Sequence, residues 1–116
     1  MQVLVLYSRQ GCCLCEGLEQ RLIALNLAGL GITLQVIDID GQDVSPELNA
    51  RYDLEVPVLV AQGRELPRVS PRLSGEGLFN WLHKVLVDSG LMFIGNAIVL
   101  AKFNRGLNAL FTEFRF

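Results

Sequence analysis

The chain has 116 residues, the length of a single domain with one hydrophobic core. Half of its residues (51%) are hydrophobic and 19% are charged, which excludes an intrinsically disordered protein. Ten basic and twelve acidic residues give a net charge of −2, so the chain lacks the basic character that nucleic-acid binding requires. We therefore expect a globular domain that does not bind nucleic acid.

The apolar runs of the chain are short. Residues 1–7 lack the basic start and the length of a secretory signal. Residues 91–101 form the longest later run and fall well below the roughly 20 residues that cross a bilayer. We expect a cytoplasmic protein, and in a reducing compartment three cysteines favour a reactive or metal-binding role over a structural disulfide.

The first half of the chain predicts a strand, a helix and a second strand. Residues 2–7 (QVLVLY) are continuously apolar, which is typical of a central strand buried on both faces. Residues 15–27 carry leucines at helical spacing and predict an amphipathic helix, which a turn at residues 28–31 ends. Residues 32–39 (ITLQVIDI) begin with the alternation of a strand.

A second helix is predicted from its start. Ser45, Pro46 and Glu47 supply a capping hydroxyl, a proline at the first helical position and an acid in the first turn. The helix is expected to end near Tyr52. The apolar run at residues 57–61 then predicts a third strand.

The remaining elements are a hairpin partner and a helix. Gln62 and Gly63 predict a turn, and residues 64–69 a weaker strand that Pro67 confines to an edge or an end of the sheet. A last helix is expected from Ser74 to about residue 87. The resulting order, β-α-β-α-β-β-α, predicts an α/β fold whose first half is a right-handed βαβ unit with parallel strands.

Three cysteines lie where the first strand gives way to the first helix. Cys12 falls at or just before the helix N-terminus, where free N–H groups and the helix dipole favour the nucleophilic thiolate form. Arg9 adds a positive charge three residues earlier. Cys15 follows one helical turn later, so its sulfur is expected beside that of Cys12. This spacing predicts an attacking thiolate at Cys12 and a resolving thiol at Cys15.

Two other interpretations of the cysteines stay open. In the first, the three cysteines are small apolar residues of the core, although their clustering argues against this interpretation. A metal site is the other, and zinc needs four Cys or His ligands. Since Cys12, Cys13 and Cys15 are accompanied only by the distant His83, we expect no metal in a monomer and leave a metal-carrying dimer as an alternative.

Residues 7–16 (YSRQGCCLCE) resemble the active-site segment of the glutaredoxins, especially the short bacterial glutaredoxin-like proteins with a Cys-x-Leu-Cys motif. Residues 55–58 (EVPV) supply the second matching element, and the resemblance covers residues 1–87. It implies the thioredoxin fold, a four-stranded mixed sheet with helices on both faces. It also implies that Pro57 is cis and faces the cysteines, and that the backbone of Val56 pairs with glutathione or a substrate peptide.

The resemblance implies a thiol–disulfide oxidoreductase that serves electron transport and cell redox homeostasis. Cys12 would form a mixed disulfide with a disulfide-containing protein or glutathione, and Cys15 would resolve it. Arg9 would stabilise the thiolate, and Val56 with Pro57 would shape the substrate groove. No tightly bound cofactor is expected, and glutathione is the candidate co-substrate.

Two features depart from the family pattern. Cys13 places an extra thiol between the two redox cysteines, where it could compete for the disulfide. The Gly-Gly-x-Asp element that holds the amino end of glutathione is not present in clean form. Residues 74–77 are the nearest segment, and we interpret them as a helix cap with an acidic first turn.

The last part of the chain is predicted to be an apolar extension. We expect a glutaredoxin-like domain at residues 1–88 and a helical extension at residues 89–116, which holds five of the six phenylalanines. The extension would pack on the domain, form a homodimer interface or lie on a membrane surface. The alternative function is therefore a non-catalytic thioredoxin-fold module that binds a partner through this tail.

Overall fold

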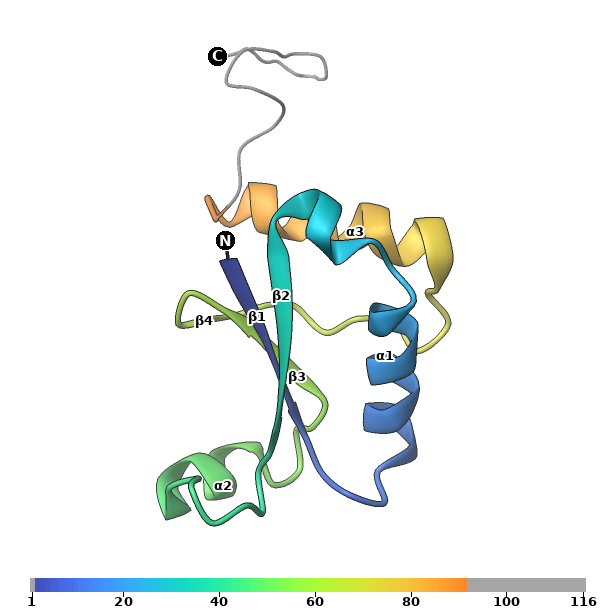
Figure 1. Cartoon of the computed structure of the whole chain (residues 1–116). Helices are drawn as coiled ribbons and strands as arrows, with labels where there is room; N and C mark the ends of the chain where they lie inside the picture. Colours follow the sequence, from blue (N-terminus) through green and yellow to red (C-terminus); the bar gives the residue numbers. More distant parts are fainter. Residues whose placement is uncertain (1, 92–116) are drawn as a thin grey trace. The chain divides into compact units, whose positions relative to one another are not determined.

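A computed structural model of the chain describes residues 2–91 (Figure 1). In chain order the elements are β1 (Gln2–Ser8), α1 (Cys13–Ile23), the 3₁₀ helix η1 (Leu27–Leu30), β2 (Ile32–Asp38), α2 (Pro46–Tyr52), β3 (Val58–Ala61), β4 (Arg64–Glu65) and α3 (Gly75–Asp88). The predicted α/β order of strands and helices is therefore confirmed.

The chain divides by its backbone contacts into two units, Met1–His83 and Lys84–Phe116. The predicted extension at residues 89–116 lies, from residue 92 onward, outside the described residues. Its expected helix, its roles in homodimerisation or membrane contact, and the domain boundary at residue 88 thus stay predictions. No helix within residues 2–91 is long and apolar enough to cross a membrane.

The first unit is built on a four-stranded mixed sheet with the order β2-β1-β3-β4 (Figure 1). β1 pairs in parallel with β2 and antiparallel with β3, and β3 and β4 form an antiparallel hairpin. Tyr7 of β1 lies opposite Val58 of β3. The C-terminal ends of β1 and β2 and the start of β3 therefore meet at one end of the sheet, where α1 also begins.

The two faces of β1 are buried to different extents. Leu4 and Leu6 are fully buried on one face, whereas Val3 on the other face is 44% exposed. The prediction that this strand is buried on both faces is therefore wrong for the second face. The physical reason is that α2 covers only the end of that face, where Tyr7 packs near Tyr52 with ring centroids 5.0 Å apart.

Helix α1 is shorter than the predicted helix at residues 15–27, because a polar side chain interrupts it. Asn26 accepts a hydrogen bond from the Gly29 N–H through its side chain at 3.2 Å, and this bond caps η1. Asparagine offers the backbone such an alternative to helix continuation. The leucine pattern continues through this region, but the leucines after Ile23 do not belong to α1.

Helix α2 begins as predicted. The Ser45 hydroxyl accepts a hydrogen bond from the Leu48 N–H at 3.1 Å, and Pro46 is the first helical residue. Serine at this position satisfies a backbone donor that the helix itself leaves unpaired. This cap fixes where the chain turns after leaving β2 at the end of the sheet that carries the cysteines.

The hairpin of β3 and β4 is closed by the predicted turn. Gln62 and Gly63 have φ values of 51° and 79°, as a two-residue hairpin loop requires. The predicted strand at residues 64–69 is wrong in its length, since β4 has only two residues. The N–H of Leu66 still donates to β3, but Pro67 has no N–H to continue the ladder.

Candidate redox site

Cys12 and Cys15 form a disulfide at the start of α1, with their Cα atoms 5.2 Å apart. Cys12 is the N-cap residue and has extended backbone angles, so its side chain turns over the first helical turn. Its sulfur accepts a hydrogen bond from the Cys15 N–H at 3.2 Å. The structure thus brings together the two sulfurs that the sequence pairs.

The two sulfurs of this disulfide differ in accessibility. Cys12 is half-buried, whereas Cys15 is fully buried on the inner face of α1. An incoming group can therefore reach Cys12 but not Cys15. The Cys15 N–H and the positive end of the helix dipole lie at the Cys12 sulfur, and both favour its anionic form.

Cys13 is the first residue of α1, and its thiol is free and exposed. It lies one helical position beyond Cys12, so its side chain points in a different direction. In the oxidised protein the extra thiol is therefore outside the disulfide and open to solvent.

Pro57 lies at the same end of the sheet as the cysteines. The Val56–Pro57 peptide bond is cis, as the family resemblance implied. Because Tyr7 pairs with Val58, Pro57 comes level with Ser8, the last residue of β1. The loop that leads to Cys12 starts directly after Ser8, so the proline and the redox turn lie at the same edge of the fold.

The backbone of Val56 is engaged within the protein. Its N–H donates to the carbonyl of Tyr52 at 3.2 Å, beside the bond from the Glu55 N–H to the same oxygen at 2.9 Å. The side chain of Val56 is half-buried and packs against Ile39, Tyr52 and Val58. A substrate that pairs with the Val56 N–H would therefore compete with an internal bond, and this predicted binding role stays a prediction.

Arg9 is bound by two carboxylates. Its Nε donates to Asp40 at 2.8 Å, its Nη2 to the Asp53 carboxylate at 2.7 Å, and its Nη1 to the Asp53 carbonyl at 3.0 Å. The hydrogen bond that Arg9 donates to Asp40, followed by the one it donates to Asp53, raises the pKa of Arg9 above its ordinary value. Arg9 in turn lowers the pKa of Asp40, and the side chain of Asn49 lowers it further. The guanidinium of Arg9 forms its hydrogen bonds with these two acids, so its predicted effect on the Cys12 thiolate stays a prediction.

The sequence did not single out Asp40 or Asp53 as partners of Arg9. Nothing local in the sequence marks the acids after β2 as partners of an arginine. The pairing of Arg9 with Asp40 could have been found from topology. Neighbouring parallel strands end at the same end of a sheet, and Arg9 follows β1 as Asp40 follows β2.

A groove opens between α1 and the segment that follows β4. It has a volume of about 180 Å³ and is lined by Leu14, Leu18, Arg21, Pro57, Arg68, Val69 and Pro71. Pro57 is the only one of these residues that the sequence assigned to a substrate groove. The side of the groove formed by residues 68–71 was missed, because nothing local in the sequence shows that this segment returns to α1.

No cluster of three or more Cys, His, Asp or Glu side chains within residues 2–91 is arranged to hold a metal ion. The alternative of a metal-carrying dimer stays a prediction.

The mixed sheet, the disulfide at the start of α1 and the cis proline before β3 define a protein of the thioredoxin-like fold. The model of the glutaredoxin-like domain family (DUF836) matches residues 3–83, and the chain belongs to this family. The family and the paired cysteines together indicate a redox-type function.

The solved structures that are similar to the chain include the following two. The structural-genomics target protein XcR50 from X. campestris is 32% identical over 70% of this chain and 96% of its own, with a TM-score of 0.49. A malarial protein is 20% identical over 75% of this chain and 99% of its own, with a TM-score of 0.51. No curated protein matches the chain.

Proposed function

We propose that the protein is a cytoplasmic thiol–disulfide oxidoreductase of the glutaredoxin-like type, with Cys12 and Cys15 as its reacting dithiol. The observation that carries the proposal is the asymmetry of the disulfide at the start of α1. Cys12 is half-buried at the helix N-terminus, and Cys15 is fully buried. This asymmetry suits one sulfur to attack a substrate and the other to resolve the product.

In the first step the Cys12 thiolate attacks one sulfur of a substrate disulfide. A new bond forms between Cys12 and that sulfur, the substrate S–S bond breaks, and the second substrate sulfur leaves as a thiolate that takes up a proton. The N–H of Cys15 points at the Cys12 sulfur and stabilises its negative charge before the attack.

In the second step Cys15 loses its proton and attacks the sulfur of Cys12. The internal disulfide forms, and the remaining substrate sulfur leaves as a thiolate. Two electrons have then passed from the protein to the substrate. A second thiol compound, either glutathione or a protein dithiol, returns the protein to its reduced form by the reverse exchange. The protein needs no tightly bound cofactor for these steps.

The test compares three single substitutions, Cys12→Ser, Cys15→Ser and Cys13→Ser, in disulfide reduction assays and by intact mass in glutathione redox buffers. The wild-type protein should lose two hydrogens reversibly. Cys12→Ser should lose activity, and Cys15→Ser should accumulate a mixed disulfide on Cys12. Cys13→Ser is the matched control and should keep the reversible oxidation. Unchanged disulfide reduction by Cys12→Ser, or cysteines that stay reduced throughout, would contradict the proposal.

A further inference from the structure

The groove beside α1 starts at the redox turn and ends at the segment that follows β4. Leu14 lies between the two redox cysteines in sequence and contributes to the lining at this turn. Leu18, one turn further along α1, continues the same side, and Val69 and Pro71 contribute from the later segment. The groove therefore offers an apolar surface that begins at Leu14, a residue of the redox turn.

Leu14 is not a core residue. Its side chain is 60% exposed, whereas Leu18 is 1% exposed and belongs to the core. An exposed leucine inside the redox turn is in contact with water in the free protein and gains stability when an apolar group covers it. Leu14 lies two residues after Cys12 in the redox turn.

Two arginines line the groove, and neither forms a strong ion pair with a carboxylate. Arg21 donates from Nη1 to the Pro71 carbonyl at 2.7 Å, and within residues 2–91 it has no carboxylate partner. Arg68 pairs with Glu55 at 2.6 Å, with side chains 60% and 55% exposed. Ion pairs with this exposure contribute little stability, so a competing carboxylate can replace Glu55.

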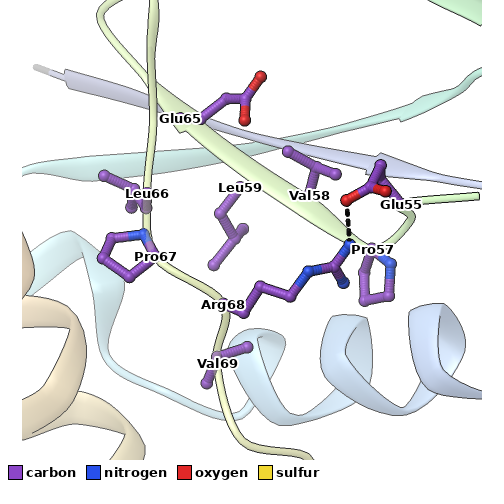
Figure 2. Close-up of a pocket in the computed structure, with 9 residues that line it drawn as sticks. All are labelled: Glu55, Pro57, Val58, Leu59, Glu65, Leu66, Pro67, Arg68 and Val69. Atoms are coloured by element: carbon purple, nitrogen blue, oxygen red, sulfur yellow. Dashed lines mark hydrogen bonds and ion pairs between the residues drawn. The ribbon is translucent and has the colours of Figure 1, made fainter. Parts of the chain in front are cut away.

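Arg68 also lines a smaller hollow next to the groove. Figure 2 shows its side chain extending from the segment after β4 toward Glu55, with the guanidinium beside Pro57. The smaller hollow, of about 50 Å³, shares Pro57, Arg68 and Val69 with the groove. A movement of Arg68 away from Glu55 would therefore change both spaces at once.

The opposite side of the redox helix has the opposite charge. Glu16, Glu19 and Asp38 line a separate hollow there together with Arg9, whose charge is already paired with Asp40 and Asp53. A negatively charged polypeptide is repelled on that side and attracted on the side of Arg21 and Arg68. The two sides of α1 thus differ in the substrates that they favour.

We propose that the groove is a specificity site for acidic protein substrates, and that it binds an apolar side chain followed by a carboxylate next to the reactive cysteine. The apolar side chain contacts Leu14 and Val69, and the carboxylate pairs with Arg68 in place of Glu55. This inference rests on the proposed oxidoreductase function and names its substrate class.

The test uses peptide disulfides as probes. Two peptides, Gly-Cys-Leu-Glu-Gly and Gly-Cys-Leu-Lys-Gly, are oxidised to their symmetric disulfides, and hydroxyethyl disulfide serves as a small substrate too short to carry either group. The measured quantity is kcat/KM for each peptide divided by kcat/KM for the small disulfide. The wild-type protein should prefer the Leu-Glu peptide over the Leu-Lys peptide by about tenfold.

Arg68→Glu should reverse this preference, because the like charge now repels the Leu-Glu peptide and attracts the Leu-Lys peptide. A gain for the Leu-Lys peptide also shows that the variant is folded. The matched control is Arg64→Glu, the same charge reversal at a residue that does not line the groove, and it should keep the wild-type preference.

The outcomes separate this inference from the proposed function. If the wild-type protein treats both peptides alike, or if Arg64→Glu changes the preference as much as Arg68→Glu does, the groove is not the specificity site and only this inference fails. If Cys12→Ser reduces the small disulfide as well as the wild-type protein does, the proposed function itself fails.

Discussion

Arg9 and Asp53 join the loop that leads to the redox cysteines with the loop that leads to Pro57. The guanidinium of Arg9 donates to both the carboxylate and the backbone carbonyl of Asp53. Asp40, just beyond the end of β2, binds the same guanidinium. Three loops at one end of the sheet are therefore held together by one side chain.

We predict that Arg9→Met makes the protein less stable at neutral pH and changes how stability depends on pH. Arg9 lowers the pKa of Asp40 in the folded state. The stabilisation from this carboxylate is therefore present above the ordinary pKa of 3.8 and is lost as the pH falls through the lower folded value. In Arg9→Met this acid-dependent part should largely disappear. The free energy of unfolding, measured in urea at several pH values from neutral to acidic, shows how much of this pH dependence is lost.

The control for this experiment is Arg72→Met. The side chain of Arg72 forms no ion pair with another of the residues from 2 to 91, so its loss should leave the pH dependence of unfolding unchanged. If Arg9→Met and Arg72→Met unfold with the same dependence on pH, the ion pairs of Arg9 do not stabilise the fold.

Alkylation of the oxidised protein should modify one cysteine. Cys13 is exposed and free, whereas Cys12 and Cys15 are joined. Iodoacetamide should therefore add one group, at Cys13, before reduction, and three groups after reduction and unfolding. Peptide mapping by mass spectrometry identifies the modified residue. Labelling of Cys12 or Cys15 before reduction would show that a different pair of thiols is oxidised.

His83 should bind a proton less readily in the folded protein than in the unfolded chain. Burial lowers its pKa below 6.5. The unfolded chain then binds more protons, so stability should decrease as the pH falls from 6.5 through the folded pKa of this group. It is the only histidine, so NMR titration of its ring protons is unambiguous. His83→Gln should remove this decrease, and a folded pKa at or above 6.5 would contradict the prediction.

Ser45→Ala should lower the free energy of unfolding by about 1 kcal/mol, because the Leu48 N–H loses its acceptor. Ser45→Asp supplies another capping oxygen and should retain most of the stability. Chemical denaturation of the three proteins under the same conditions compares them. Equal losses in both variants would indicate that the hydroxyl does not act as a cap.

The parts of the fold that the sequence predicted well depend on neighbouring residues. The start of α2 follows from Ser45 and Pro46, and the hairpin turn from Gln62 and Gly63. The pairing of Cys12 with Cys15 follows from one turn of helix. In each case the physical cause lies within a few residues, so composition and spacing were sufficient to predict the feature.

The parts that were missed depend on contacts between distant segments. The partners of Arg9 lie 31 and 44 residues away in the chain. The side of the groove near Val69 comes from a segment with no regular secondary structure, and no periodic pattern marks it. The exposed face of β1 was missed for the same reason, since it reflects how little of that face α2 covers.

Because β4 is short, most of the segment that lines the groove lies outside the sheet that positions Cys12. Because β4 ends at Glu65 and Pro67 and Pro71 offer no backbone donors, the chain between the hairpin and α3 is not tied into the sheet beyond Leu66. Side chains in this connection can change without disturbing the ladder that positions Cys12. Under the proposed function, substitutions in this connection alter which substrates the protein selects while Cys12 and Cys15 keep their place.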